Sequence, residues 1–250
     1  MTALLPVGVR ARLRLVVALL GCGAVVLALH VFVFNVDTDI GVEDRIYLNM
    51  IAKQYGVALD MQGRPVSWQQ QLDTVRAVQD AVLSAAPDNT PLALDGGREP
   101  KDVFLARSGL CYDRSRVIEK MLGALGMKTR HIAMYQLAGR GKLATLLSRK
   151  VVSHAITEVQ TVRGWMVVDS NARWISLGVD GMPRSLAQMQ AALATAPIAF
   201  EQPQLQNEIY RQPFTFVYGL YSRHGRFYRT PLGKAIVNAN FADTLDNLTD

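Results

Sequence analysis

The stretch CYDRSRVIEKMLGALG (residues 111–126) begins with a cysteine and carries the clearest helical pattern in the chain. Its apolar side chains recur at a spacing that places them on one face of a helix. Gly126 is a typical residue for the end of such a helix. We therefore predict an amphipathic helix that packs this stripe on another layer of the fold. The stripe consists of Val117, Ile118, Met121, Leu122 and Leu125.

Three strand-like segments follow this helix. They are TRHIAMYQL (129–137), VVSHAITEVQ (151–160) and GWMVVDSNARW (164–174). The last two flank a short turn at residues 162–164 and are typical of a β-hairpin. This order predicts an α+β fold in which a helix packs on an antiparallel sheet. Further helices are predicted at 40–56, 67–87 and 185–196, and an aromatic strand or packing segment at 214–228.

An apolar run near the N-terminus, LVVALLGCGAVVLALHVFVF (15–34), has 20 residues and no charge. A helix needs about 20 apolar residues to cross a bilayer, so we predict one transmembrane anchor. Two alternatives stay open, because LLGC ending at Cys22 resembles a lipoprotein signal and a cleaved signal peptide also has an apolar core. Mostly apolar residues follow Cys22, and no small-x-small cleavage site ends the run.

Charges on either side of the run predict its direction. Arg10, Arg12 and Arg14 precede it, whereas four acidic residues follow it within positions 35–44. Because basic residues favour the cytoplasmic side, the short N-terminus is expected in the cytoplasm. The chain is thus predicted to be a single-pass inner (plasma) membrane protein whose larger part is periplasmic or otherwise extracytoplasmic.

The charge of the outer part excludes one class of partner. Of the 27 basic residues three precede the run, which leaves 24 against 21 acidic residues. This small, dispersed excess does not predict nucleic-acid binding. The segment GRGKLATLLSRK (139–150) is basic and is predicted as a loop. It lacks the spacing and the Ser or Thr of a phosphate-binding loop.

Cys111 is the only cysteine outside the membrane run, so the outer part cannot form an internal disulfide. An unpaired thiol is either a small buried hydrophobe or a reactive group. At a helix start, free N–H groups and the helix dipole favour an anion such as a thiolate. Gly109 would let the backbone turn tightly. The N–H of Cys111 could donate to an oxyanion.

A nucleophilic thiol needs a base, and the base needs an orienting acceptor. His154 lies on the first strand of the hairpin and Asp169 on the second. A two-residue loop at 161–162 would place position 154 opposite 169, and a four-residue loop at 161–164 would place it opposite 171 with 169 as diagonal neighbour. Because side chains alternate along a strand, His154 and Asp169 share a face in both registers. The hairpin therefore predicts a catalytic set of Cys111, His154 and Asp169.

These segments together resemble the transglutaminase-like superfamily. GLCYDRSRVIEKMLGALGMKTRHIAMY (109–135), SHAITEV (153–159) and GWMVVDSNARW (164–174) follow that family's order of a helix-start Cys, a strand with His and a strand with Asp. The resemblance covers residues 100–178. It implies a papain-like or transglutaminase-like core with Cys111 as nucleophile, His154 as base and Asp169 as orienter.

The resemblance also implies a function. Family members include cross-linking enzymes, peptidases, amidases and deamidases, so we expect a thiol enzyme that forms a Cys acyl-enzyme with a peptide or protein amide and ends in hydrolysis or acyl transfer. The alternative is a non-catalytic relative with partners in an envelope-assembly or polysaccharide system. Arylamine N-acetyltransferases have a similar Cys-His-Asp order but carry RGG where this chain has RSGL (107–110).

Two departures from the family pattern bear on the site. Related thiol enzymes often have a Gln ahead of the Cys as second oxyanion donor, and residues 101–110 contain none. Many members have Asp-Pro after the second strand, where this chain has Asp169-Ser170-Asn171. Asn171 is therefore an alternative orienter.

Three residues near Asp169 are candidate substrate-binding residues: Trp165, Asn171 and Trp174. The alternative interpretation of Trp165 and Trp174 is that they pack in the hydrophobic core. No paired ligand spacing joins the histidines, so neither a metal nor another cofactor is predicted. The predicted organisation is a cytoplasmic N-terminus (1–14), a transmembrane anchor (15–34), a helical lead-in segment (35–99) and a transglutaminase-like catalytic domain with a C-terminal extension (100–250).

Overall fold

The structure is a computed structural model, and it describes residues 7–33, 35–57, 65–93, 97–223, 227, 229–230, 233–234 and 237–249. The chain divides into two compact units, Met1–Asn35 and Val36–Asp250. The helices are α1 Val7–Val33, α2 Val42–Gln54, α3 Trp68–Ala85, α4 Pro100–Ala106, α5 Cys111–Ala124, α6 Lys142–Leu147, α7 Leu186–Leu193 and α8 Phe241–Thr244. The strands are β1 Thr129–Gln136, β2 Ser153–Thr161, β3 Gly164–Val168, β4 Phe214–Tyr218, β5 Leu220–Ser222, β6 Arg229–Thr230, β7 Gly233–Lys234 and β8 Asn238–Ala239.

The first unit consists of α1. Its segment Ala11–Leu29 is long and apolar enough to cross a membrane, and its side chains are exposed. At 1.5 Å per residue, these 19 residues span about 28 Å, close to the thickness of the hydrocarbon core. The expected apolar helix is therefore present. The direction in which it would cross stays a prediction, and position 34 of the predicted span lies outside the described residues.

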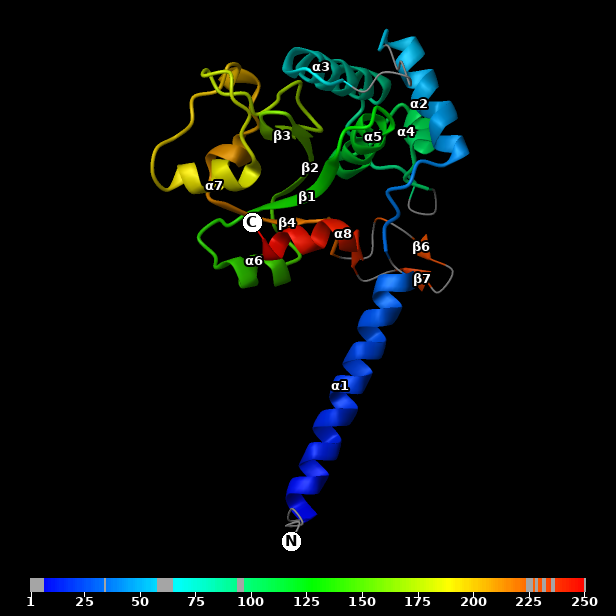
Figure 1. Ribbon diagram of the computed structural model, residues 1–250, viewed down its shortest axis with the longest axis vertical. Helices are drawn as coiled ribbons and strands as arrows, with labels where there is room; N and C mark the ends of the chain where they lie inside the picture. Colours follow the sequence, from blue (N-terminus) through cyan, green and yellow to red (C-terminus); the bar gives the residue numbers. More distant parts are fainter. Residues whose placement is uncertain are drawn as a thin grey trace. The chain divides into compact units, whose positions relative to one another are not determined.

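The second unit is built on a four-stranded sheet with the order β3-β2-β1-β4, in which every pair is antiparallel. Figure 1 shows α5 on one side of this sheet together with α2, α3 and α4, and α7 on the other side. The predicted α+β fold with a helix on an antiparallel sheet is confirmed.

The face under α5 holds the larger core. All five apolar residues of the predicted α5 stripe are buried, and they pack against Val159, Met166 and Val168 of the sheet. Helix α5 ends at a glycine, because Gly126 has a φ of 74° that side chains disfavour. Helix α3 buries Leu72, Val75, Val78 and Val82 in the same core. The predicted lead-in segment 35–99 and α5 therefore share one hydrophobic interior.

The opposite face carries a second core, which α7 and the segment that follows it cover. Trp174 packs edge-on against Phe200 and at a tilt against Tyr210, with ring centroids 5.2 and 5.0 Å apart. Ile156 and Val167 contribute from the sheet. The short 3-10 helices that complete this unit are η1 Pro203–Leu205, η2 Glu208–Arg211 and η3 Leu245–Leu248.

Several local expectations differ from the structure. The predicted loop at 139–150 contains the short helix α6, and α4 was not expected from the sequence. The predicted strand at 164–174 ends at Val168, and the residues after it form turns. The aromatic segment forms β4 and β5, which Gly219 separates with a φ of 70°. A side chain at Gly219 would also lie 2.4 Å from the carbonyl oxygen of Asn240, so the C-terminal segment packs directly on this backbone.

Candidate active site

Cys111 is the first residue of α5 and is half-buried. The turn before it is fixed by Asp113, whose carboxylate accepts the N–H of Leu110 at 2.9 Å. Gly109 matters here for space, because a Cβ at this position would lie 3.1 Å from Cβ of Asp113. The predicted helix start at Cys111 is thus held by a side-chain cap.

A buried ion pair anchors this cap. Arg98 Nη1 contacts both carboxylate oxygens of Asp113, at 3.0 and 3.2 Å, and both side chains are almost completely buried. Burial raises the pKa of Asp113, whereas the charge of Arg98 and the N–H of Leu110 lower it. The first turn of α5 therefore depends on a cation supplied by the segment ahead of α4.

His154 and Asp169 meet in the β2–β3 hairpin. Nε2 of His154 lies 2.9 Å from Oδ2 of Asp169, and both side chains are buried. The hairpin pairs Thr157 with Val168 and Thr161 with Gly164. Of the two registers considered, this is the one that leaves position 169 diagonal to 154, and it still brings the two side chains together.

The protonation of this pair follows from its surroundings. Burial alone would lower the pKa of His154, but the charge and hydrogen bond of Asp169, followed by Cys111, raise it to about 10. Burial raises the pKa of Asp169, whereas His154 and further donors lower it more, so its net shift is downward. An imidazolium–carboxylate pair is the stable form at neutral pH.

Cys111 lies within interaction range of the His154 ring, since both its side chain and its charge raise the pKa of His154. Because Nε2 of the ring contacts Asp169, Nδ1 is the nitrogen left for the thiol. The structure therefore joins His154 to Asp169 directly, and Cys111 is close enough to the ring to influence its pKa.

The carboxylate of Asp169 is held by more than His154. Oδ2 also accepts the hydroxyl of Tyr210 at 2.7 Å, and Oδ1 accepts the N–H groups of Asn171 at 2.6 Å and Ala172 at 2.8 Å. Burial raises the pKa of Tyr210 well above its usual value, so this hydroxyl remains a donor. A carboxylate held in this way has a fixed orientation toward the imidazole.

The backbone around Asp169 is braced from α3. Nε2 of Gln79 donates to the carbonyl oxygens of Asp169 at 2.8 Å, Ala172 at 3.0 Å and Trp174 at 2.7 Å. Gln79 is only 3% exposed. The turn that carries Asp169 is therefore fixed by a residue 90 positions earlier in the chain.

Arg114 lies beside Cys111 on the next turn of α5. Its Nη1 donates to Oδ1 of Asn171 at 2.9 Å. Its Nε is buried and has no hydrogen-bond partner among the residues that the structure describes. Burial lowers the pKa of Arg114, and the charge of Cys111 is the largest opposing influence. Asn171 is thus exposed and engaged by Arg114, and Asp169 rather than Asn171 contacts the imidazole.

The family comparison agrees with the order of these residues. Residues 64–170 match the model of the transglutaminase-like superfamily. This segment is therefore similar to a transglutaminase-like core. A search of curated proteins finds no match.

Solved structures that are similar to the chain include one from a bacterium. It is the crystal structure of a "putative cysteine protease" from Cytophaga hutchinsonii, at 15% identity and a TM-score of 0.28. The similarity covers 60% of this chain and 49% of that protein, so the chain spans about half of its length.

The transglutaminase-like core contains Gln79, Cys111, His154 and Asp169 but ends before Tyr210. The sequence offers no signal for Gln79 or Tyr210, because a glutamine in an amphipathic helix and a tyrosine in an aromatic segment are both ordinary. Both residues act through hydrogen bonds to Asp169, from which they are 90 and 41 positions apart in the sequence. The sequence gives a weak indication that Arg114 belongs to the site. It follows Cys111 by three positions and therefore lies on the same face of the helix.

The two tryptophans lie away from the thiol. Trp174 is 1% exposed and belongs to the aromatic core. Trp165 pairs with Gln160 near the hairpin turn, at the end of β2 opposite to His154, and the guanidinium of Arg130 lies 4.1 Å from its ring centroid. The structure does not bring either side chain to Cys111.

A second polar cluster in the core resembles the site but differs in one respect. His131 Nδ1 lies 2.6 Å from Glu119, and Tyr221 donates to the same carboxylate at 2.6 Å. Ser115 Oγ also approaches Nδ1, at 3.3 Å. The hydroxyl and the carboxylate thus compete for one ring nitrogen, whereas a triad uses both. His131 is fully buried, so this cluster joins α5 to the sheet.

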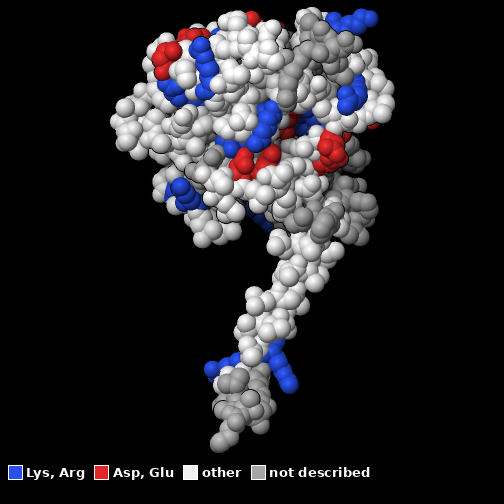
Figure 2. Space-filling view, in the orientation of Figure 1, with Lys and Arg blue, Asp and Glu red and all other residues white. Residues whose placement is uncertain are grey.

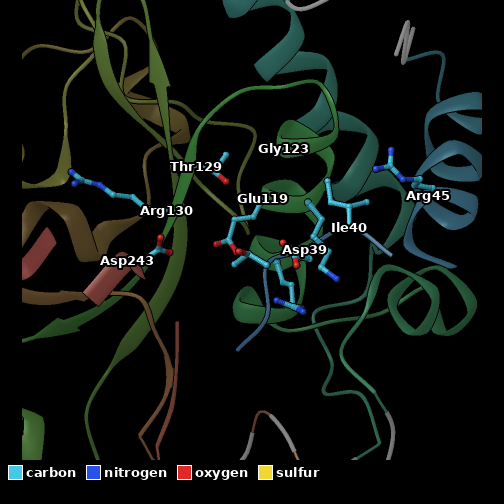
Figure 3. Close-up of a pocket in the computed structure, with 11 residues that line it drawn as sticks. Asp39, Ile40, Arg45, Glu119, Gly123, Thr129, Arg130 and Asp243 are labelled. Carbon is cyan, nitrogen blue, oxygen red and sulfur yellow. The ribbon is translucent and has the colours of Figure 1, made fainter. Parts of the chain in front are cut away.

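A pocket of about 320 Å³ lies along α5, away from the thiol. Figure 3 shows Glu119 at its centre, directed toward the side where Arg130 and Asp243 lie. Burial raises the pKa of Asp243 to about 6. Neither Cys111 nor His154 lines this pocket, so we do not assign it to the candidate active site.

Proposed function

We propose that this protein is a membrane-anchored thiol enzyme that cleaves or exchanges amide bonds through an acyl-enzyme on Cys111. The contact of His154 with Asp169, together with a half-buried Cys111 at the start of α5, is the observation that carries this proposal. Helix α1 would provide the anchor, and the charges around it favour an extracytoplasmic domain. Peptide or protein amides are the substrate class, and no cofactor enters the reaction.

The reaction would proceed in two steps. The Cys111 thiolate attacks the amide carbonyl carbon, and the resulting oxyanion faces the free N–H groups of the first turn of α5. The C–N bond then breaks as protonated His154 gives its proton to the leaving nitrogen. In the second step His154 takes a proton from water or an amine, which attacks the thioester and releases Cys111.

Asp169 supports both steps. It keeps the ring oriented and stabilises the imidazolium, and its four hydrogen bonds restrict its own movement. The non-catalytic alternative needs a thiol directed into the core and far from the ring. A half-buried Cys111 that interacts with His154 favours the enzyme instead.

Alkylation of Cys111 tests the proposal without a known substrate. At pH 6 a thiol without a cationic partner is almost entirely protonated. We expect iodoacetamide to modify Cys111 of the full chain at least about tenfold faster than it modifies glutathione. Peptide-level mass spectrometry separates Cys111 from Cys22, and Cys111→Ala is the control. Equal rates for Cys111 and glutathione would contradict the proposal.

Tyr210→Phe provides a second expected result. The variant keeps the ring that packs on Trp174 but removes the donor to Asp169. A hydrogen bond to a charged group contributes about 1.5–3 kcal/mol, so we expect alkylation of Cys111 at pH 6 to slow by about tenfold. Tyr221→Phe is the matched control, because it removes a tyrosine bond to the carboxylate Glu119 in the other cluster. Equal effects of the two variants would argue against a positioning role for Tyr210.

A further inference from the structure

The connection between β1 and β2 is basic and lies next to the candidate active site. We define the basic lip as Arg140, Lys142, Arg149 and Lys150, which flank or begin α6. All four side chains are exposed. None of the four forms an ion pair with a carboxylate within the part of the chain that the structure describes.

The charge of this region is one-sided in the sequence as well. No Asp or Glu occurs between Glu119 and Glu158, although seven Lys and Arg residues do. The rest of the outer part has 17 basic and 21 acidic residues and is therefore slightly acidic. In Figure 2 a group of basic side chains lies over the region that α6 occupies in Figure 1, without an acidic group beside it. The lip therefore produces a local positive potential.

Strand connectivity places the lip at the thiol end of the sheet. The lip follows the end of β1 and precedes β2, whose second residue is His154. Because α5 leads into the start of β1, its first residue, Cys111, lies near the end of β1. The lip and the candidate nucleophile thus occupy the same end of the sheet.

Side-chain contacts connect the two more closely. Arg223 donates to the carbonyl oxygens of Thr145, at 3.2 Å, and Leu146 in α6. Its guanidinium carbon also lies 4.4 Å from the ring centroid of Tyr135. Burial raises the pKa of Tyr135, and among the weaker influences the charge of Cys111 raises it too. Arg223 thus links α6 to Tyr135, whose pKa responds to the charge of Cys111.

We propose that the basic lip binds an acidic segment of the polypeptide on which Cys111 acts. This inference rests on the proposed amide chemistry and adds the substrate class. Exposed cations without carboxylate partners attract an anionic chain, and the exposed Leu143 and Leu147 of α6 can contact its apolar side chains. An anionic bilayer fits less well, because α6 has six residues and only these two of its three leucines are exposed, which is less apolar surface than an interfacial helix needs.

Protection of Cys111 tests this inference. The full chain is placed in nanodiscs of phosphatidylcholine, and iodoacetamide alkylation of Cys111 is followed with and without poly-L-glutamate. We expect poly-L-glutamate to slow alkylation at low salt, poly-L-lysine to have no such effect, and the protection to fade at high salt. The triple variant Lys142→Glu, Arg149→Glu, Lys150→Glu should weaken the apparent affinity at least about tenfold.

A matched triple variant distinguishes an effect of the basic lip from an effect of the net charge of the protein. Arg45→Glu, Lys53→Glu, Lys128→Glu changes the charge equally at exposed positions away from the lip, and it should retain protection. Absence of protection in the unmodified chain, or equal loss in both triple variants, would overturn the inference. A bilayer contact would give another pattern, which would also overturn the inference. Phosphatidylglycerol in the disc would then shield Lys142 and Lys150 from chemical acetylation, whereas poly-L-glutamate would not protect Cys111 from alkylation. Failure of the proposed function gives a different result: Cys111 then reacts no faster than glutathione, whatever the lip binds.

Discussion

Asp169→Asn is expected to lower the rate of amide cleavage by on the order of 10³–10⁴-fold while leaving the fold intact. The substitution keeps the size of the side chain and its capacity to accept the N–H groups of Asn171 and Ala172. It removes the charge that opposes the effect of burial on His154. The imidazole then loses its proton far more readily and no longer supports a thiolate at neutral pH.

The sign of the pH effect follows from the two influences on His154. With Asp169 present its pKa is raised to about 10, so the ring stays protonated through the neutral range. Without the carboxylate, burial lowers the pKa of His154 toward or below its ordinary value of about 6.5. Titration of the ring by NMR should therefore show a transition near pH 10 in the unmodified chain and a much lower one in Asp169→Asn. A transition near pH 10 in both would contradict the role of Asp169.

Alkylation at pH 6 supplies a measurement that needs no substrate. We expect Cys111 to react on the order of 10²-fold more slowly in Asp169→Asn, because a thiol without a cationic partner is mostly protonated at this pH. Glu119→Gln is the matched control: it neutralises a buried carboxylate that contacts His131 through the same kind of bond. Its alkylation rate should stay close to that of the unmodified chain, even if its stability falls.

Local sequence patterns predict those parts of the fold whose causes are local. The stripe of α5, the helix predicted at 67–87 (α3) and the hairpin around Gly164 depend on residues a few positions apart, and the structure contains all three. The helix predicted at 40–56 is present as α2, but its apolar residues differ in burial. Ile51 is buried, but Ile46 and Met50 are 53% and 44% exposed, because α2 meets the core through Leu48 instead.

In the candidate site, too, some contacts follow from local sequence patterns and others depend on the tertiary fold. A period of two along β2 and β3 is enough to place His154 and Asp169 on one face, provided that the turn has an even number of residues and no bulge interrupts the strands. Gln79 and Tyr210 reach Asp169 only after α3 and η2 have packed around the hairpin. Nothing within a few residues of either position encodes that contact. The pairing of Arg98 with Asp113 likewise depends on the path of the chain before α4.

Arg98→Ala is expected to lower the free energy of unfolding by about 3–5 kcal/mol, because it leaves a buried carboxylate without its cation. Arg98 and Asp113 are 1% and 0% exposed, so water cannot replace the lost partner. Asp113 also caps the turn before Cys111 through the N–H of Leu110. We therefore expect the variant to lose Cys111 reactivity together with stability, as measured by urea unfolding in detergent micelles and by alkylation.

The pH dependence distinguishes a buried charge from simple loss of packing. In Arg98→Ala, burial raises the pKa of Asp113 without the opposing effect of the guanidinium. A group whose folded-state pKa exceeds its unfolded value loses stability as the pH rises between the two values. The loss of unfolding free energy in Arg98→Ala, relative to the unmodified chain, should thus be small near pH 4 and grow toward neutral pH. The double variant Arg98→Ala, Asp113→Asn should recover much of the lost stability, because it no longer buries an unpaired carboxylate.

Arg76→Ala is the control for this measurement. It breaks the exposed pair with Glu201 and should lower the free energy of unfolding by less than about 1 kcal/mol at any pH. A deficit independent of pH would assign the effect of Arg98 to packing rather than to its charge.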